Sequence, residues 1–258
     1  MGQGTRWLAL GALAWLAAAG CLPPRYASSP SGADGAVTAR PLPAAPGPAD
    51  AGCSRSSPVL SSDVTNARDL GGVPLGANGS VACGMVLRGP PLAGLSPVGC
   101  ADATALGLRT VIDLREKDER GARPDDACVG ANVISAPLPI PYDVDATDYL
   151  ADFDTDASIA LIFHTLADAA AFPVYLHCTY GRDRTGVVAA AVLLALGASR
   201  ADVLEEYSIS AANVGAFPAS LAAVLDEIDR RGGIDAALAA KGVSPADLAS
   251  LRARVTAP

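Results

Sequence analysis

One segment near the middle of this 258-residue chain limits the available folds more than any other. Pro173–Leu176 is a short apolar run that ends at His177, and Thr185–Leu196 is almost wholly apolar. The first pattern is typical of a buried strand, and the second is typical of a helix buried in the middle of a domain. The segment therefore predicts a strand, a short loop and a buried helix in succession, as found in α/β domains.

The rest of the chain after about residue 58 repeats this alternation of strands and helices. Strands are predicted over Ser80–Leu87, Arg109–Leu114 and from Asn132 to Ser135. Helices are predicted from Ser96 to about Leu106, over Asp148–Ala171, and from starts near Ser199, Pro218 and Ser244. We expect an α/β fold with a mostly parallel central sheet flanked by helices, ending in a C-terminal helical segment.

The N-terminus has the pattern of an export signal. Arg6 precedes an uncharged apolar run of thirteen residues, Trp7–Ala19, which is shorter than the about 20 residues that a membrane-spanning helix needs. Small residues then lead to Cys21, in a pattern that resembles the bacterial lipobox. We expect residues 1–20 to be a lipoprotein signal peptide and Cys21 to be lipidated; the alternative is ordinary cleavage after Ala19.

Residues 21–57 are rich in Pro, Ala, Ser and Gly. Such a stretch buries too little apolar surface to offset its ordering entropy, so we expect a disordered linker. A folded domain is expected over residues 58–258. The protein is expected to be exported, as a membrane-anchored lipoprotein of the bacterial cell envelope or, without the lipid, in periplasmic or secreted form.

Charge and histidine content exclude several classes of function. The chain has 27 acidic and 19 basic residues, a net charge of −8, so no nucleic-acid partner is expected. Its only histidines are His164 and His177. Two histidines rule out a multi-histidine metal site.

The loop between the predicted strand and buried helix has the residues for binding a tetrahedral dianion. Its backbone N–H groups and the following helix N-terminus provide positive potential, which also favours the thiolate form of Cys178. Arg184 can bind two oxygens at once, and Thr185 can donate its hydroxyl to the sulfur when sulfur is the leaving group. Gly181 and Gly186 permit close approach of the backbone.

Residues 177–186 read His-Cys, five residues, Arg-Thr-Gly. This pattern resembles the signature of the protein tyrosine phosphatase superfamily. Segments 66–72, 109–115, 202–210 and 233–254 are similar to further motifs of its bacterial tyrosine/serine phosphatase branch. The resemblance covers residues 58–258, and it implies a phosphatase-like fold and hydrolysis of phosphate monoesters through a cysteinyl-phosphate intermediate, with no metal or other cofactor.

Carried over by position, the resemblance implies that Cys178 is the nucleophile and Arg184 the phosphate clamp. The general acid is either Asp183, inside the loop, or Asp143, which lies 35 residues before the cysteine where other members of the superfamily place a mobile acid loop. The remaining residues expected to bind substrate are Thr179, Tyr180, Gly181, Arg182, Thr185 and Gly186. Supporting roles are expected for His177, Asp113 and Arg115.

Two loop positions depart from the branch pattern. Tyr180 replaces the usual alanine and is expected to reshape the pocket, and Arg182 replaces a lysine that some members use beside phosphoinositides. The expected substrate is a phosphotyrosine protein or a small phosphate monoester. An inositol-phosphate or phosphoinositide phosphatase is the first alternative, and a non-catalytic phosphate-binding module is the second.

Four further cysteines remain in this predicted exported protein: Cys53, Cys83, Cys100 and Cys128. They allow two disulfides in three connectivities, with free buried thiols as the alternative. Arg120 and Arg123, after Lys117, could extend the anion-attracting surface, but the mixed charges of residues 117–126 favour a solvated loop.

Overall fold

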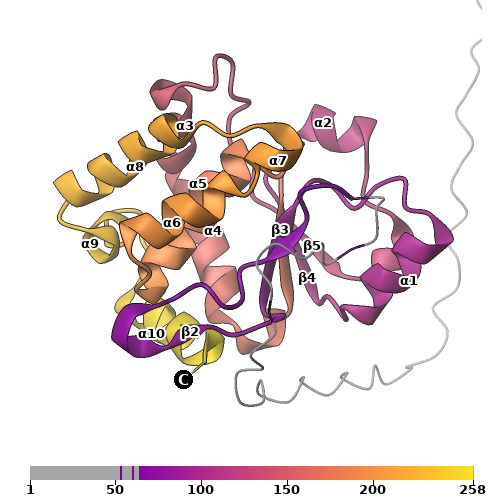
Figure 1. Ribbon diagram of the computed structural model, residues 1–258, viewed down its shortest axis with the longest axis horizontal. Coiled ribbons are helices and arrows are strands. Elements are labelled where there is room, and N and C mark those ends of the chain that lie inside the picture. Colours follow the sequence, from indigo (N-terminus) through magenta and orange to yellow (C-terminus); the bar gives the residue numbers. More distant parts are fainter. Residues whose placement is uncertain (1–52, 54–59, 61–63, 258) are drawn as a thin grey trace, which may run out of the picture. The chain divides into compact units, whose positions relative to one another are not determined.

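The computed structural model describes Cys53, Leu60 and residues 64–257 (Figure 1). The predicted signal peptide, Cys21 and most of the predicted linker lie outside the described residues, so these predictions stay untested.

The central sheet has five strands in the order β1-β3-β6-β4-β5. Their bounds are β1 Arg68–Asp69, β3 Val86–Gly89, β4 Thr110–Asp113, β5 Asn132–Ser135 and β6 Val174–His177. The pairs β3–β6, β6–β4 and β4–β5 are parallel, and only β1 is antiparallel, on the edge beside β3. The predicted mostly parallel sheet is therefore confirmed. In the register of the central strands, His177 is paired with Gly89 on one side and Asp113 on the other.

Alternating side chains of the strands supply two separate apolar layers. Val86, Ile112 and Leu176 face the larger core, whereas their neighbours Leu87, Val111 and Tyr175 belong to a smaller core that includes Ala103 of α1 (Pro97–Ala105). This period of two is expected for strands buried on both faces.

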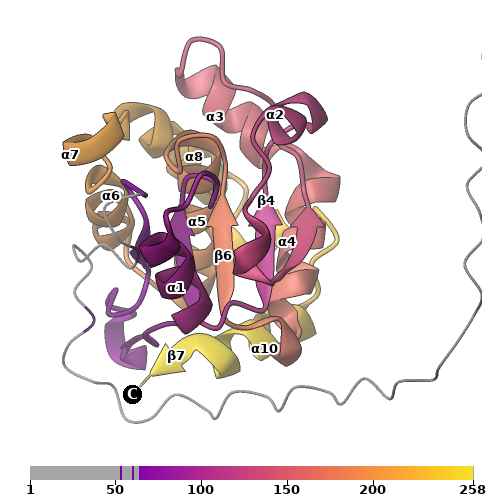
Figure 2. The same cartoon turned by 90° about the vertical axis from the view of Figure 1, so that its right-hand side faces the viewer.

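Figure 1 shows the sheet nearly edge-on, with α1 on one side and most helices on the other, and Figure 2 shows α1 in front of the strands. The larger layer contains α3 Ala146–Phe153, α4 Asp156–Ala167, α5 Asp183–Leu196, α6 Arg200–Ser208, α8 Pro218–Arg230, α9 Ile234–Ala239 and α10 Pro245–Val255. The C-terminal helical segment is as predicted. The central helix α5 is buried along nearly its whole length, as its apolar sequence requires.

The helix starts follow their capping residues. The Ser96 side chain accepts from the Gly99 N–H at the start of α1, Ser199 caps α6 through Asp202 N–H, and Ser244 caps α10 through Asp247 N–H. Proline occupies the start of α1, α8 and α10, where its missing N–H costs nothing. These local signals explain why the predicted helix starts agree with the structure.

Two predicted elements are wrong. The single strand predicted over 80–87 is two strands, β2 (Ser80–Val81) and β3, because Gly84 turns the chain with φ +70° between them. β2 instead pairs with β7 (Thr256–Ala257) in a separate two-stranded sheet. The helix predicted over 148–171 is α3, α4 and a 3₁₀ turn at Ala169–Ala171, with the first break at Asp154 and Thr155.

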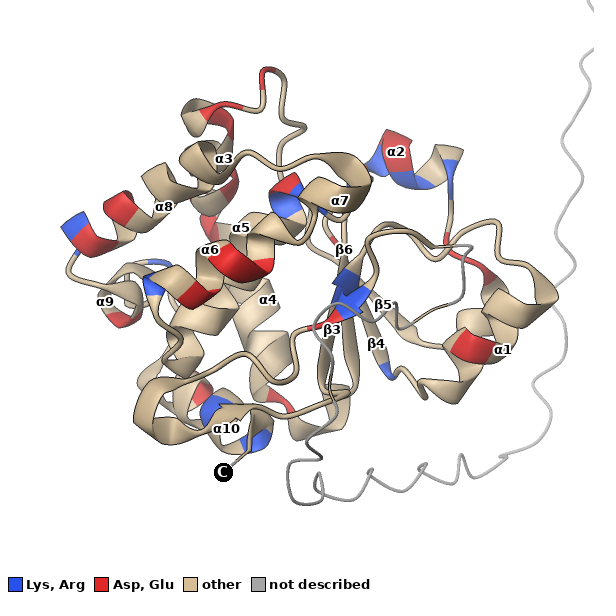
Figure 3. Cartoon of the chain, in the orientation of Figure 1, with Lys and Arg blue, Asp and Glu red and all other residues tan. Residues whose placement is uncertain are grey.

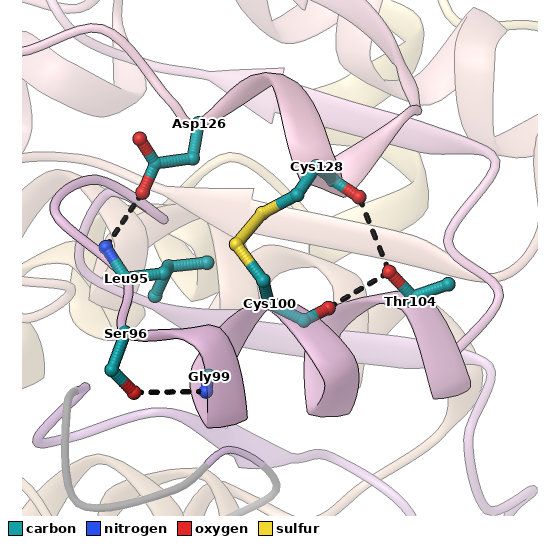
Figure 4. Close-up of a disulfide and its surroundings, with 7 residues drawn as sticks. All are labelled: Leu95, Ser96, Gly99, Cys100, Thr104, Asp126 and Cys128. Atoms are coloured by element: carbon teal, nitrogen blue, oxygen red, sulfur yellow. Dashed lines mark hydrogen bonds between the residues drawn. A yellow bond between two sulfur atoms is a disulfide. The ribbon is translucent and has the colours of Figure 1, made fainter.

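Both pairs of cysteines that the structure describes outside the loop form disulfides, Cys53–Cys83 and Cys100–Cys128. The Cα separations of 5.8 and 5.7 Å are normal for such bonds. Cys100–Cys128 joins α1 to the 3₁₀ turn Ala127–Val129, next to the hydrogen bonds of Thr104 and Asp126 (Figure 4). Cys53–Cys83 ties residue 53, in the predicted linker, to the folded part of the chain.

A search of the described residues found no helix that is both long and apolar enough to cross a membrane.

Candidate active site

The loop after β6 brings the predicted nucleophile and clamp to one pocket. β6 ends at His177, and α5 begins at Asp183, two residues earlier than predicted. Cys178 is buried, with 1% of its surface exposed, and it is the free cysteine among those that the structure describes. The pocket has a volume of about 240 Å³. Its lining consists of Glu119, Ile140, Pro141, Val144, Cys178, Thr179, Tyr180, Arg182, Asp183 and Arg184.

Arg184 is held by a residue that the sequence did not single out. Both terminal nitrogens of its guanidinium donate to the Glu119 carboxylate at 2.7 Å, and one also donates to Thr179 Oγ1 at 3.1 Å. Glu119 comes from α2 (Lys117–Ala122), which lies at the carboxyl ends of the strands (Figures 1 and 2). Partial burial opposes its ionisation, but the hydrogen bonds from Arg184 and Thr179 lower the pKa of Glu119 to about 2.

The end-on grip of Glu119 leaves one edge of Arg184 available. Its Nε is buried and has no hydrogen-bond partner among the described residues. A guanidinium held in this way can still donate from Nε to an oxyanion, and Nη2 can add a second donor when the oxyanion replaces Thr179 Oγ1. Glu119 therefore fixes the direction of the clamp without filling the edge that would bind phosphate.

Asp183 is at the end of a directed chain of hydrogen bonds. The Phe217 N–H donates to Tyr207 Oη at 3.0 Å, and the two tyrosine oxygens Tyr207 and Tyr149 are 2.6 Å apart. Tyr149 Oη then donates to Asp183 Oδ1 at 2.6 Å. Burial and the adjacent carboxylate raise the pKa of Tyr149, so its hydroxyl keeps the proton that it donates.

Arg182 completes the shell of donors around Asp183. Its Nε and Nη2 donate to the two carboxylate oxygens at 2.7 and 3.1 Å. Arg182 also donates to the carbonyl of Val214, and its guanidinium lies 4.6 Å from the Phe217 ring centre and 5.8 Å from the Tyr180 ring centre. Three donated hydrogen bonds therefore hold the Asp183 carboxyl group in one orientation.

Asp143 lies on an exposed loop beside the pocket. Its neighbours Ile140, Pro141 and Val144 form part of the pocket wall, whereas the Asp143 side chain is exposed. The Asp148 carboxylate fixes the loop by accepting from the N–H groups of Asp143 at 2.8 Å and Val144 at 2.6 Å. Asp143 is thus placed at the pocket rim, and Asp183 is placed in its lining.

His177, Asp113 and Arg115 lie together beneath the loop. The Arg115 Nε and Nη2 donate to Asp113 at 2.9 and 2.8 Å. His177 Nδ1 lies 3.4 Å from the carbonyl oxygen of Cys178, and its Nε2 lies 3.1 Å from Asp125 Oδ2. Asp113, Asp125 and His177 are close enough to bind a cation, but the Arg115 guanidinium already contacts both carboxylates. Asp113, Asp125, Arg115 and His177 therefore form a network of polar contacts next to the start of the loop.

Two glycines allow the loop to pack closely. Gly181 has φ +64°, and a Cβ there would lie 2.2 Å from the carbonyl carbon of Gly89. A Cβ on Gly186 would lie 2.7 Å from the Tyr207 ring. Thr185 is fully buried, and its hydroxyl has no partner among the described residues.

Comparison with known proteins agrees with this geometry. The model of a family described as the tyrosine phosphatase family matches residues 60–257. The chain belongs to the tyrosine phosphatase family. The predicted family and the class of enzyme, a tyrosine-phosphatase-type phosphatase, are thereby confirmed.

One curated relative is distantly similar to this chain. A curated protein of Cupriavidus necator, provisionally named a tyrosine-protein phosphatase, is 27% identical over 164 residues, which are 56% of this chain and 59% of that protein. The chain thus spans less than two thirds of this relative's length.

Similar solved structures include TpbA of P. aeruginosa, at 22% identity and TM-score 0.41, covering 64% of this chain and 91% of that one. A TpbA variant in complex with phosphotyrosine has the same identity, TM-score 0.42, and coverage of 65% and 91%. The catalytic domain of the PP-IP phosphatase SIW14 of S. cerevisiae, in complex with citrate, is 15% identical with TM-score 0.39, covering 59% and 89%.

Within this tyrosine phosphatase family member, sequence reasoning missed the acidic partner of the clamp. The interpretation of residues 117–126 as a loop is wrong, because 117–122 form α2 and Glu119 lines the pocket, although none of these residues is buried. Asp125 is also engaged, with His177 and the Leu92 N–H. The capping-box pair Glu116 and Glu119 predicts a helix start, but nothing in the local sequence shows that Glu119 also reaches Arg184.

Proposed function

We propose that this protein is an exported phosphatase that hydrolyses phosphate monoesters, above all phosphotyrosine in proteins, through a cysteinyl-phosphate intermediate. The observation that carries the proposal is the pocket in which Cys178, the loop after it and the fixed Arg184 converge. The name of the curated relative, which assigns tyrosine-protein phosphatase activity, supports the same substrate class.

In the proposed first step, the Cys178 thiolate attacks phosphorus and forms an S–P bond while the P–O bond to the substrate breaks. The loop amides and the unpartnered Nε of Arg184 stabilise the charge on the phosphoryl oxygens in the transition state. The departing oxygen takes a proton from a general acid. In the second step, the carboxylate left by the first step takes a proton from water as the water attacks phosphorus. The S–P bond breaks, and inorganic phosphate and the thiolate are released, with Thr185 placed to donate to the sulfur.

We assign the general acid to Asp143. Donors from Tyr149 and Arg182 occupy both oxygens of Asp183, so this side chain is not free to turn toward the departing oxygen. Asp143 is on the loop that supplies the pocket wall, and its exposed carboxyl group is free of such donors among the described contacts. In this proposal Asp183 holds Arg182 and the first turn of α5.

The pocket rim favours an aromatic monoester over a substrate with many phosphates. Ile140, Pro141 and Val144 form an apolar wall, and Tyr180 is 57% exposed beside the opening. Arg182, the second cation of the lining, is already bound by Asp183 and the Val214 carbonyl. An inositol polyphosphate would need further free cations, whereas an aryl phosphate needs one anion site and an apolar wall.

Export is proposed from the disulfides together with the N-terminal pattern. Disulfides persist mainly outside reducing compartments, and both bonds in the described residues suit an exported protein. We propose that Cys21 carries a lipid that anchors the protein to a membrane of the cell envelope. Mass spectrometry of membrane-extracted protein would detect the lipid, and an unmodified chain cleaved after Ala19 would contradict the anchor.

The test of activity is a substrate panel with the purified protein and its Cys178→Ser variant. The panel contains a phosphotyrosine peptide, an aryl phosphate and inositol hexakisphosphate. We expect the highest kcat/KM on the phosphotyrosine peptide and a loss of at least about a thousand-fold in the variant. Equal turnover by Cys178→Ser would reject the mechanism. Preferred hydrolysis of the inositol phosphate would reject the substrate class, and tight peptide binding without turnover would point to a binding module.

A further inference from the structure

The back of the proposed phosphate-binding loop is held by two side chains, one from just before β1 and one from β3. Asn66 Nδ2 lies 3.0 Å from the carbonyl oxygen of Tyr180 and 3.3 Å from that of Gly181. Arg88 Nη2 lies 2.9 Å from the carbonyl oxygen of Gly181 and 3.3 Å from that of Arg182. Three consecutive loop carbonyls therefore accept hydrogen bonds from two buried side chains, Asn66 just before β1 and Arg88 in β3.

These contacts help to determine where the loop N–H groups point, together with the Gly186 N–H, which donates to the Arg182 carbonyl at 2.7 Å. A trans peptide unit is planar, and its C=O and N–H point in opposite directions. The cis peptide of the described chain is Phe172-Pro173, so the loop peptides are trans. When the carbonyls of Tyr180, Gly181 and Arg182 point back to Asn66 and Arg88, the N–H groups of the next residues in each unit point away from them. Tyr180 and Arg182 line the pocket whereas Asn66 and Arg88 do not, so the face of the loop opposite these two donors is its pocket face.

The Asn66 side-chain amide can donate to the loop only when its nitrogen faces the loop, and a hydrogen bond from Arg68 stabilises this orientation. Arg68 Nη1 donates to Asn66 Oδ1 at 2.7 Å, which leaves the amide nitrogen to face the loop. Asn66 has φ +69°, a left-handed conformation that asparagine adopts more readily than most residues. Both the backbone conformation and the two-sided amide therefore suit asparagine at this position.

Glu206 of α6 holds the two arginines behind the loop. Its two oxygens accept from Arg68 Nε and Arg88 Nη1, each at 2.6 Å, and all three side chains are buried. Figure 3 shows basic residues on β3 and acidic residues on the neighbouring α6. Two guanidinium groups with one carboxylate leave one positive charge, which contacts the loop carbonyls. Such a charge polarises the loop peptides in the sense that favours an anion on their N–H side.

We propose that Asn66 and Arg88 are positioning residues for phosphate: they hold the carbonyls of the loop so that its amides face the oxyanion. The inference rests on the proposed function of the loop as the phosphate site. The inference gives Asn66, the first residue of the segment 66–72, a specific role, whereas the family resemblance gave this segment none. Neither side chain lines the pocket, so both act through the loop.

The experiment measures tungstate binding, by calorimetry, to the full chain and to its Asn66→Asp variant. Aspartate keeps the size of asparagine and the contact with Arg68, but it places an oxygen against the carbonyls of Tyr180 and Gly181. We expect tungstate to bind about ten-fold more weakly or worse, with a parallel fall in kcat/KM. The second variant is Arg88→Lys. Lysine keeps the positive charge but lacks the two terminal nitrogens with which Arg88 contacts Glu206 and the loop at the same time. We expect this variant also to bind tungstate more weakly.

The matched control is Lys241→Met, which removes a buried cation bonded to Asp156 far from the loop in sequence. We expect it to lower the melting temperature while tungstate affinity stays within about two-fold. If Asn66→Asp and Arg88→Lys bind tungstate as tightly as the native protein, the positioning role is wrong. If the native protein itself does not bind tungstate, the proposed phosphate site fails, and this inference fails with it. Should Asn66→Asp not fold, Asn66→Ala, which removes both N–H donors and adds no oxygen, replaces it under the same criteria.

Discussion

The clamp of this phosphatase depends on a single acidic side chain outside the signature loop. Glu119 binds both terminal nitrogens of Arg184, and Glu119→Gln keeps the shape but removes the charge and one acceptor. We expect kcat/KM to fall by about ten-fold or more because the guanidinium is then free to turn from its productive direction. Steady-state kinetics on the phosphotyrosine peptide measure this, with Asp118→Asn on the same helix as control. An unchanged kcat/KM would show that Arg184 needs no such partner.

A second prediction at the residue scale concerns Asp152 on α3. Both of its carboxylate oxygens are buried without a partner among the described residues, and burial raises its pKa to about 8, with Asp183 and Asp148 acting in the same direction and Arg184 against it. From about pH 4 to about pH 8 the folded protein keeps a proton that the unfolded chain has released. The contribution of Asp152 to stability therefore falls as pH rises through this range.

Asp152→Asn removes this titration, so we expect the variant to be more stable than the native protein at pH 8, by on the order of 2 kcal/mol. Denaturant unfolding at pH 5 and pH 8 measures the difference, and Asp118→Asn controls for loss of an exposed carboxyl group. The same pH slope in Asp152→Asn and the native protein would contradict the assignment.

At the scale of elements, the two candidates for the general acid, Asp143 and Asp183, lie on different kinds of segment. Asp143 lies on the loop between β5 and α3, whereas Asp183 is in the first turn of α5, where Tyr149 and Arg182 saturate its carboxylate. We expect Asp143→Asn to lose far more activity on phosphotyrosine, whose phenol has a pKa of about 10, than on p-nitrophenyl phosphate, whose leaving group needs little protonation. Asp183→Asn is expected to lose activity equally on both substrates. The reverse pattern would assign the acid to Asp183.

The same scale shows which elements a sequence pattern can predict. Ser96-Pro97, Ser199 and Ser244-Pro245 mark helix starts through contacts with their own next turn, so they are readable locally. Ser80–Leu87 resembles one strand because its apolar pattern is continuous. Its division into β2 and β3 depends on partners distant in the chain, Thr256–Ala257 for one and Val174–His177 for the other.

At the scale of the whole molecule, the two disulfides make the stability of the folded protein depend on redox conditions. They span 30 and 28 residues, and loops of this length predict about 3–4 kcal/mol from each bond. We expect reductant to lower the melting temperature markedly, and Cys100→Ala with Cys128→Ala to do so in part while kcat is retained. Calorimetry with and without reductant measures this. Alkylation of all four cysteines before reduction would contradict both bonds.

The sequence by itself determined the strand, the loop and the buried helix that carry Cys178 and Arg184, because this geometry is contained in a few consecutive residues. It also determined the family and the mostly parallel sheet. Only the tertiary structure decided that Glu119 orients Arg184, that Asn66 and Arg88 hold the loop from behind, and which cysteines pair. The physical reason is that an acidic residue on a short helix has the same local pattern whether it faces water or a guanidinium 65 residues away.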